Sequence, residues 1–472
     1  MKPNIFFLLI DSFRADKCYG KNKTSITPNL DFIIKNSAYF SQTIPSAPVT
    51  CPSVSSIFTS KYPFESVIET ENHFKLNLKI SNYADFLREH GYTTYAITPE
   101  LISYMGLSKV FEENYETYDS SSTLYDGLGE KIIKKLQTNL SEPWFYYVHL
   151  LDIHGSATFQ LDSEPKKFQN QKFGANQYER MVSAMDVWIG KILKKINLDN
   201  TIFVLTADHG SEVGVYTPEI EEYRNNVRQY KKIYFESTHK ITSKLPKSFS
   251  PIRSMLSKAY SNRKRKQIKQ QRHEEAEKIH LQNLGPYKER LMKNSVESTL
   301  DVFDERFCVP LIFSGYGISE YKILDQQVRS IDIFPTILEI IGVNSLNDAR
   351  GRSLYSLIKG DKEDELPVMI ESAANSPKSM TANTIGIRTS NYKYFRNRSE
   401  STKNVNLYDL KNDPFEENNI ANDNQDLVLE MEDHLKKIKN DLDFSFSREL
   451  TDDVNEDEDA LIEKELKKLG YI

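Results

Sequence analysis

Short apolar segments alternate with amphipathic segments along most of the chain. Runs such as NIFFLLI and TIFVLT are almost entirely apolar, which is typical of strands buried on both faces of a parallel sheet. Segments with helical periodicity separate these runs, and strands that alternate with helices indicate a mostly parallel sheet. The expected strands include 4–10, 92–97, 144–151 and 201–206, and the expected helices include 27–40, 83–91, 176–195 and 328–343. The pattern therefore predicts an α/β fold, in which helices flank a mostly parallel sheet.

Two regions depart from this pattern. Residues 216–298 contain 19 Lys and Arg against 9 Asp and Glu, so they carry a net charge of +10 and leave −16 on the rest of the chain. Such a run is typical of a solvated, mainly helical insertion. It would also suit contact with an acidic partner, such as a phosphorylated glycan, an anionic lipid surface or nucleic acid, or a lid over the site. We predict a catalytic domain over 1–364 that contains the insertion, a smaller α+β domain over 365–450 and an acidic tail over 451–472.

The composition excludes several classes of protein. With 39% hydrophobic residues, including 26 Tyr and 25 Phe, the chain of 472 residues is not wholly disordered. Its three Cys cannot form a disulfide framework, and no C-x-x-C pair is present to hold zinc. The net charge of −6 argues against a protein that coats nucleic acid, which we do not expect as a partner. With neither a transmembrane run of about 20 apolar residues nor a signal peptide, we expect a cytoplasmic location and leave a leaderless export route open.

Candidate chemistry follows several of the expected strands. Asp11 ends the first strand, Asp152 and His154 follow the strand WFYYVHLL, and Asp208-His209 follow TIFVLT. Ligands bind outside the carboxyl ends of the strands in open parallel sheets, so these residues point to one edge of one sheet. A single Asp after a strand is usually a turn or cap residue, but three such clusters favour a metal site.

Thr50 is expected at the start of a helix. The following Pro52 suits a helical first turn, and backbone N–H groups at a helix N-terminus favour an anion. A hydroxyl at that place beside a divalent cation can ionise and attack phosphorus or sulfur. From this segment alone, the simpler interpretation is a plain N-cap residue.

Several stretches in one order resemble the sulfatase branch of the alkaline phosphatase superfamily. The stretches are NIFFLLIDSFRADKCYG (4–20), TPNLD (27–31), SAPVTCPSVSSIFTSKYP (46–63), REHGYTTYAI (88–97), FYYVHLLDIHG (145–155), TADHGSEVG (206–214), FDERFCVPLIFSG (303–315), VRSIDIFPTILEIIGV (328–343), GRSL (351–354), LYDLKNDPFEENNIA (407–421) and LGYI (469–472). The resemblance implies an alkaline-phosphatase-like catalytic domain, a smaller C-terminal domain, one or two divalent metals and a covalent intermediate.

The resemblance also implies roles for individual residues. Asp11, Asp208 and His209 fall on the metal positions, and Thr50 falls on the nucleophile position. His154 falls on a histidine that contacts the substrate or protonates the leaving group. Three further residues are weaker candidates: Ser12, His149 and Asp152. Asp152 and His149 could instead be structural polar groups at a strand end.

The departures from the family pattern are informative. Sulfatases carry Cys or Ser at the nucleophile position, in the pattern C/S-x-P-x-R, and this residue is later oxidised to formylglycine. Here Thr50 stands at that position, Cys51 is one place too late, and Val54 replaces the arginine. Ser12 replaces the second leading acidic ligand, and the run TPELISY at 98–104 lacks the lysine and histidine that sulfatases often carry there.

Threonine nucleophiles occur in phosphoryl-transferring relatives of the sulfatases. These are nucleotide pyrophosphatases/phosphodiesterases and enzymes that move phosphoglycerol or phosphoethanolamine. We therefore expect a metal-dependent hydrolase or transferase of phosphodiester or phosphonate esters that acts through Thr50. One alternative is a sulfuric ester hydrolase that works without formylglycine. The other is a non-catalytic scaffold with the sulfatase fold.

The ligand set bears on the cofactor and the substrate. Two carboxylates, an imidazole and a hydroxyl favour Mn²⁺ or Zn²⁺, with Ca²⁺ or Mg²⁺ left open. The spacing D-x-H at Asp152 and His154 differs from the D-x-x-x-H of two-metal relatives, so one metal is expected. The expected partner is an anionic ester, on a glycan or a lipid head group.

Overall fold

The computed structural model of the chain describes residues 2–69, 74–138, 140–154, 165–213, 270, 285–297, 302–318, 320–372 and 383–441. The chain forms two compact units. One unit comprises Met1–Ser211 with Leu300–Ile472, and the other comprises Glu212–Thr299. All candidate site residues named above belong to the first of these units, so the site can be described within it.

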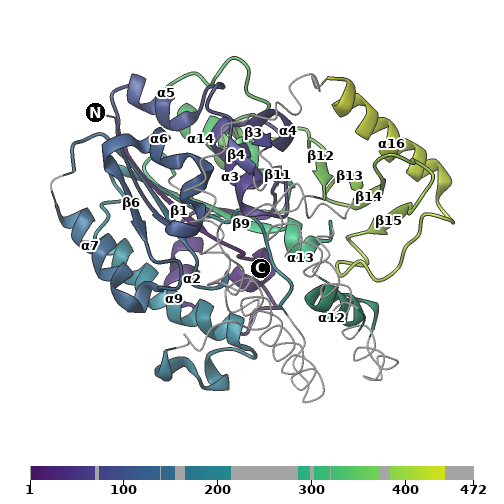
Figure 1. The fold of residues 1–472 in the computed structure, drawn as a ribbon, viewed down its shortest axis with the longest axis horizontal. Coiled ribbons are helices and arrows are strands. Elements are labelled where there is room, and N and C mark those ends of the chain that lie inside the picture. Colours follow the sequence, from purple (N-terminus) through teal and green to yellow (C-terminus); the bar gives the residue numbers. More distant parts are fainter. Residues whose placement is uncertain are drawn as a thin grey trace, which may run out of the picture. The chain divides into compact units, whose positions relative to one another are not determined.

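The larger unit is built around a sheet of nine strands (Figure 1). The strands are β1 (Asn4–Ile10), β2 (Ala38–Ile44), β5 (Thr93–Pro99), β6 (Tyr115–Tyr118), β7 (Trp144–Leu150), β8 (Thr201–Thr206), β9 (Val309–Gly315), β10 (Lys322–Leu324) and β11 (Val328–Arg329). Eight strands follow the order β10-β2-β9-β8-β1-β7-β5-β6, and β11 pairs with β2. Only the pairs that β9 makes with β2 and β8 are antiparallel. The predicted α/β fold with a mostly parallel sheet is confirmed.

Helices cover both faces of this sheet (Figure 1). The longer ones are α2 (Pro28–Ile34), α3 (Thr50–Thr59), α5 (Tyr83–Glu89), α7 (Gly129–Gln137), α9 (Gln177–Leu193) and α14 (Ile333–Ile340). Shorter helices are α1 (Ala15–Cys18), α4 (Pro63–Ser66), α6 (Leu107–Phe111), α13 (Asp304–Phe307) and α15 (Tyr355–Lys359), and a small hairpin is formed by β3 (Val67–Glu69) and β4 (Phe74–Leu76).

Aromatic residues fill the core between the sheet and α3, α5 and α14. The Phe334 ring of α14 stacks on Phe7 of β1 at 5.5 Å and on Tyr83 of α5 at 4.7 Å between ring centroids. Phe58 of α3 packs edge-on against Tyr147 of β7 at 5.1 Å. Rings in these arrangements each bury a large apolar area, so α3 is fixed firmly against β1 and β7.

Two predicted helices are shorter than expected. Of the helix predicted over 328–343, Val328–Arg329 form strand β11, Ser330–Asp332 form a 3-10 turn, and only Ile333–Ile340 form α14. The helix predicted over 27–40 ends at Ile34, and Ala38 begins strand β2. The apolar residues of both elements continue one pattern, so periodicity does not reveal the break. The polar residues between them, Lys35-Asn36-Ser37, form the turn that separates helix from strand.

A second, antiparallel sheet follows the first. It contains β12 (Val368–Glu371), β13 (Thr384–Arg388), β14 (Tyr392–Asn397) and β15 (Asn406–Asp409) in that order, and α16 (Gln425–Asn440) packs against it. This is the smaller α+β part predicted at the C-terminal side. The predicted acidic tail at 451–472 lies outside the described residues.

Buried ion pairs join the second sheet to the part of the chain that contains the first sheet. The carboxylate of Asp304, in α13, lies 2.6 Å from Arg388 of β13 and 2.6 Å from Lys393 of β14. The ammonium of Lys393 also lies 2.9 Å from Glu416. Breaking such a pair leaves an uncompensated buried charge, so this cluster specifies where the second sheet docks.

The smaller unit is described over only part of its length. Its described residues include helix α12 (Pro286–Glu297). Most of the predicted basic insertion, 216–298, lies outside the described residues. Its helical content and its expected role as a lid or as a contact for an acidic partner therefore stay predictions.

Candidate functional site

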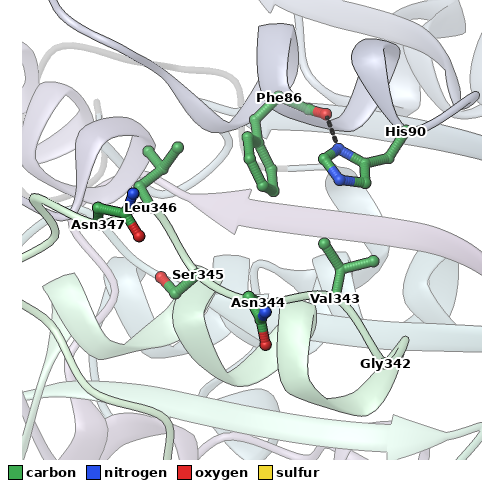
Figure 2. A pocket seen from close by; sticks show the side chains of 8 residues that line it. All are labelled: Phe86, His90, Gly342, Val343, Asn344, Ser345, Leu346 and Asn347. Atoms are coloured by element: carbon green, nitrogen blue, oxygen red, sulfur yellow. Dashed lines mark hydrogen bonds between the residues drawn. The ribbon is translucent and has the colours of Figure 1, made fainter.

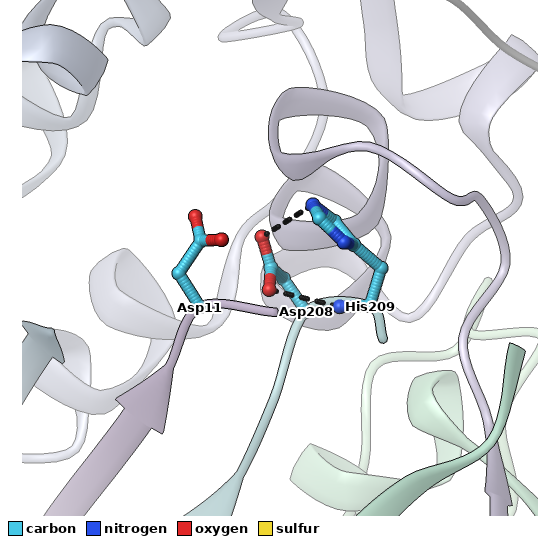
Figure 3. A group of neighbouring side chains, drawn as sticks. All are labelled: Asp11, Asp208 and His209. Carbon is cyan, nitrogen blue, oxygen red and sulfur yellow. Dashed lines mark hydrogen bonds and ion pairs between the residues drawn. The ribbon is translucent and has the colours of Figure 1, made fainter. Parts of the chain in front are cut away.

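The site lies where three neighbouring parallel strands end. Strand β1 lies between β7 and β8, so Asp11, His154 and Asp208 follow three adjacent strands at the same edge of the sheet. Figure 3 shows Asp11 after β1 and Asp208-His209 after β8, with their side chains turned toward one another. The sequence-based expectation that these strand ends meet at one edge agrees with this arrangement.

Asp11, Asp208 and His209 form the centre of the site. One ligand atom from each lies within 4.8 Å of the others, and all three residues are buried. Burial opposes ionisation of Asp11, but His154, His149 and His209 outweigh that effect and hold the pKa of Asp11 well below its usual range. Burial, together with the nearby Asp11 charge, raises the pKa of Asp208. The two carboxylates therefore lie close together in a buried position, and this arrangement favours a bound cation.

The donor atoms fit a divalent metal. Among the described residues no hydrogen-bond donor reaches Oδ2 of Asp208, although the atom is buried. The ring of His209 lies with Nδ1 2.7 Å from the Gly210 carbonyl, which can only accept. Nδ1 therefore carries a proton, and Nε2 lies 3.4 Å from Asp208 Oδ2, where it can serve as a metal ligand once it carries no proton. Two carboxylates and an imidazole gathered in this way could hold a divalent metal.

Thr50 is the first residue of α3, and its side chain is directed into this cluster. Its hydroxyl donates a 3.1 Å hydrogen bond to Asp11 Oδ2 and lies 3.4 Å from His209 Nε2. Ser53, one turn further, donates a 2.5 Å hydrogen bond to the Asp208 carbonyl and ties α3 to β8. Thr50 is only half-buried, so its hydroxyl combines access with the positive end of a ten-residue helix.

Cys51 takes no part in the site. Its side chain is buried in the core, where its thiol donates to the Phe74 carbonyl at 3.1 Å. Burial raises the pKa of this thiol to about 12. The residue that follows Thr50 therefore cannot replace it as a nucleophile without a rearrangement of the helix.

Ser12 stands between the two carboxylates. Its hydroxyl donates to Asp11 Oδ1 at 2.7 Å, and its backbone N–H donates to Asp208 Oδ1 at 3.2 Å. The residue has φ of 64°, in the left-handed region that non-glycine residues seldom adopt. Strain of this kind persists where the surroundings require it, and here it orients both acidic side chains.

The remaining predicted residues have different environments. His154 Nε2 lies 3.8 Å from Asp11 Oδ1, and burial lowers the pKa of His154. His149 Nε2 lies 3.5 Å from Asp11 Oδ2. Asp152 is not part of the ligand group among the described residues, and its Oδ1 accepts a hydrogen bond from the Leu124 N–H at 2.9 Å. Burial raises the pKa of Asp152 to about 7.

Two residues of the site surroundings were not identified from the sequence. The Tyr147 hydroxyl lies 2.9 Å from His149 Nδ1. The Tyr178 hydroxyl, on α9, donates to the Ser12 carbonyl at 2.8 Å and accepts from the Arg14 N–H at 3.1 Å. Both residues appear in the sequence as ordinary apolar positions of a strand and a helix, so no motif marks them.

A cavity of about 460 Å³ lies at a different place in the larger unit (Figure 2). It is lined by Phe86, His90 and the loop 342–347, and the Phe86 and His90 rings face that loop. His90 precedes β5, and its carbonyl accepts from Lys2, which precedes β1. The cavity therefore lies toward the amino ends of the strands, whereas Asp11 follows the carboxyl end of β1.

Comparison with protein families covers nearly the whole chain. The Sulfatase family model matches residues 3–343. A second model, N-sulphoglucosamine sulphohydrolase, C-terminal, matches residues 300–441. Within the described part of the chain, no helix has the length and apolar character needed to cross a bilayer.

Individual proteins give the same result. Arylsulfatase K of Gallus gallus is 21% identical over 485 residues, covering 93% of this chain and 83% of that protein. An ulvan-active sulfatase of Formosa agariphila is 25% identical over 236 residues, 44% of this chain and 45% of that protein. The solved structure of a 2-O GAG sulfatase superposes with a TM-score of 0.64 at 18% identity, covering 93% of this chain and 92% of that one.

These matches bear on the expected activity. The relatives named above are sulfatases, so the expectation of phosphate-ester transfer gains no support from them. The alternative expectation, hydrolysis of a sulfuric ester, fits them better. These relatives do not show whether Thr50 acts as the nucleophile.

Proposed function

The chain belongs to the sulfatase family, and we propose that it hydrolyses sulfate esters at a single divalent metal, with Thr50 in place of formylglycine. The observation that carries this proposal is the position of the Thr50 hydroxyl, 3.1 Å from Asp11 and 3.4 Å from His209. A hydroxyl so placed touches two residues of the candidate metal centre and is also open to a substrate.

Each residue has a distinct role in the proposed reaction. When bound, a divalent cation held by Asp11, Asp208 and His209 would favour ionisation of the Thr50 hydroxyl and offset charge on the ester oxygens. Thr50 Oγ1 forms a bond to sulfur as the ester S–O bond breaks. Because burial lowers the pKa of His154 and favours its neutral form, His154 is proposed to accept the Thr50 proton and to pass it to the leaving oxygen. Water then cleaves the sulfothreonine and restores the hydroxyl.

We propose a sulfated glycan as the substrate class. The relatives named above include an ulvan-active sulfatase and a 2-O GAG sulfatase. An anionic ester of this kind matches the cationic character that a metal and the α3 N-terminus give to the site.

Phosphate esters form a second candidate substrate class. The observation that favours them is again Thr50, because the threonine cannot be converted to the aldehyde that sulfatases use. A phosphodiester or phosphonate would pass through a phosphothreonine by the same attack. The two candidates share every residue of the site and differ only in the central atom of the ester.

The test uses the full chain with added Mn²⁺, Zn²⁺ or Ca²⁺. Turnover is measured on p-nitrophenyl sulfate, p-nitrophenyl phosphate, bis(p-nitrophenyl) phosphate, p-nitrophenyl phenylphosphonate and a sulfated disaccharide. Thr50→Val removes the hydroxyl at nearly constant shape. Thr59→Val is the matched control, since Thr59 lies at the other end of α3 and donates only to the Ser55 carbonyl.

Three outcomes are distinguishable. Preference for sulfate that Thr50→Val abolishes and Thr59→Val spares supports the proposal. Preference for a diester or phosphonate with the same variant pattern overturns it in favour of the second candidate. A chain that binds none of the metals and turns over none of the esters overturns both and favours a non-catalytic scaffold.

A further inference from the structure

A buried histidine beside the proposed metal centre has no role in the reaction described above. His149 lies in β7, its side chain is fully buried, and within the described residues its Nε2 makes no hydrogen bond that meets ordinary geometry. The nearest acidic atom to this nitrogen is Asp11 Oδ2, at 3.5 Å. A buried polar atom directed at a carboxylate requires an explanation.

The strand register explains why His149 and Asp11 meet. Phe7 of β1 pairs with Tyr147 of β7, and Leu9 pairs with His149. Side chains two residues apart in a strand point to the same face. Tyr147 and His149 therefore share the face of Phe7 and Leu9, and Asp11 follows Leu9 by the same interval of two residues.

The other ring nitrogen of His149 identifies where its proton lies. Nδ1 is 2.9 Å from the Tyr147 hydroxyl, which is both a donor and an acceptor. If Nδ1 carried the proton, Nε2 would direct a lone pair at the Asp11 carboxylate, which also has only lone pairs. If Tyr147 donates to Nδ1 instead, Nε2 carries the proton and its N–H is directed at Asp11. Electrostatics favours the second arrangement.

Tyr147 is itself held rigidly. Its ring is fully buried, with Phe58 of α3 at 5.1 Å edge-on and Phe111 of α6 stacked at 5.9 Å. Because its ring is closely packed, Tyr147 cannot move its hydroxyl oxygen away from His149 without disturbing the core. The orientation of the imidazole is therefore determined by packing two residues away from it.

We propose that Tyr147 and His149 are positioning residues, which hold the Asp11 carboxylate in the orientation that the metal needs, and that His149 is not itself a ligand. This inference rests on the metal centre of the proposed function. Among the described residues, the group of ligand atoms within 4.8 Å of one another consists of Asp11, Asp208 and His209, without His149. Hydrogen bonds to ligating groups from such outer residues orient those groups and strengthen metal binding.

The test measures Mn²⁺ affinity of the full chain, by titration followed with electron paramagnetic resonance, in four variants. His149→Gln places an amide nitrogen near the position of Nε2 and keeps a donor for Asp11. His149→Asn places its amide near Nδ1 and loses that donor. Tyr147→Phe removes the hydroxyl that orients the ring. Tyr146→Phe is the control, because Tyr146 lies on the same strand but on its opposite face.

The expected order of affinities is specific. His149→Asn should weaken Mn²⁺ binding by about tenfold or more, as loss of an outer-shell partner commonly does. Tyr147→Phe should weaken it by roughly three- to tenfold, while His149→Gln and Tyr146→Phe should stay within about threefold of the parent chain. Melting temperatures of the metal-free variants, measured in parallel, report any general loss of packing.

Several results would overturn the inference. Equal loss in His149→Gln and His149→Asn would indicate that His149 binds the metal directly. Unchanged Mn²⁺ affinity in His149→Asn, whether or not its melting temperature falls, would leave only a structural role. If the parent chain does not bind Mn²⁺, the inference is also wrong. Mn²⁺ affinity is measured without substrate. The result can therefore be interpreted even if the proposed sulfatase activity is not found.

Discussion

The hydroxyl of Thr50 donates a hydrogen bond of 3.1 Å to Asp11, although 39 residues separate the two in the chain. The contact forms because α3 begins over the carboxyl end of β1 and is held there by Ser53 and by the aromatic core. The fold itself thus positions the hydroxyl and the carboxylate. Pre-organisation of this kind avoids a reorganisation cost during the reaction.

Removal of one carboxylate should have opposite effects on stability and on metal binding. Asp208→Asn relieves the repulsion between two buried carboxylates and keeps an oxygen for the N–H groups of Ser12 and His209. We expect the metal-free variant to be as stable as the parent chain, or more stable by about 1 kcal/mol. Added Mn²⁺ should raise the melting temperature of the parent chain and leave that of the variant unchanged.

Calorimetry with EDTA and with Mn²⁺ checks this prediction. The control is Asp199→Asn, a change at an exposed position just before β8. If the parent chain and Asp208→Asn respond alike to Mn²⁺, Asp208 does not bind the metal.

Cys51 should be dispensable for activity. Its thiol is buried beside the Phe74 carbonyl and has a pKa of about 12, so it is neither ionised nor accessible. Cys51→Ala should cost roughly 1 kcal/mol of unfolding free energy and leave kcat unchanged. The intact mass should correspond to an unmodified Thr50 and a free thiol. A mass deficit on the peptide that contains both residues would reveal an aldehyde and contradict the threonine mechanism.

The role of His154 should depend on the leaving group. A proton donor matters most when the departing oxygen is strongly basic, as in an alkyl or sugar sulfate. His154→Ala should lower kcat/KM on a sulfated disaccharide by about 10²- to 10⁴-fold and on p-nitrophenyl sulfate by less than about tenfold. His90→Ala, beside the distant cavity, is the control. Equal losses on both substrates would assign His154 to binding rather than to proton transfer.

Asp152 should make stability fall as the pH rises. Its pKa is raised to about 7 by burial, whereas in the unfolded chain an aspartate has a pKa of about 3.9. The folded chain therefore keeps this proton to higher pH than the unfolded chain does. Stability from the neutral form is complete below the unfolded pKa and is lost as the pH rises through about 7.

Urea denaturation of Asp152→Asn at several pH values tests this sign. The parent chain should lose roughly 2 to 4 kcal/mol relative to the variant between pH 4 and pH 8. The variant keeps an oxygen for the Leu124 N–H, so the comparison concerns charge rather than the hydrogen bond. Parallel pH profiles for the two chains would show that Asp152 titrates normally.

Much of the fold could be predicted from the sequence because its central strands are buried on both faces. The runs that form β1, β7 and β8 are continuous and apolar, and such runs are readily recognised as buried strands. The break between α2 and β2 could not be predicted, because both elements are apolar and the turn between them is short. Pattern reveals the type of long elements better than their ends.

The site was predictable only in part. Asp11, Asp208 and His209 could be predicted as one group because they follow clearly apolar strands. Asp152 and His154 look alike in the sequence, yet Asp152 accepts from a loop N–H while His154 faces Asp11. The relation of Tyr147 to His149 follows the strand period, but only the register of β7 beside β1 reveals that Asp11 lies next to them.

The backbone conformation of Ser12 limits which side chains can replace it. At φ of 64°, the position disfavours most side chains but accepts asparagine and aspartate more readily than others. An aspartate could therefore replace Ser12 without a change of backbone and add a carboxylate beside Asp11 and Asp208. A centre with three carboxylates and one imidazole would favour harder cations than a centre with two carboxylates and one imidazole.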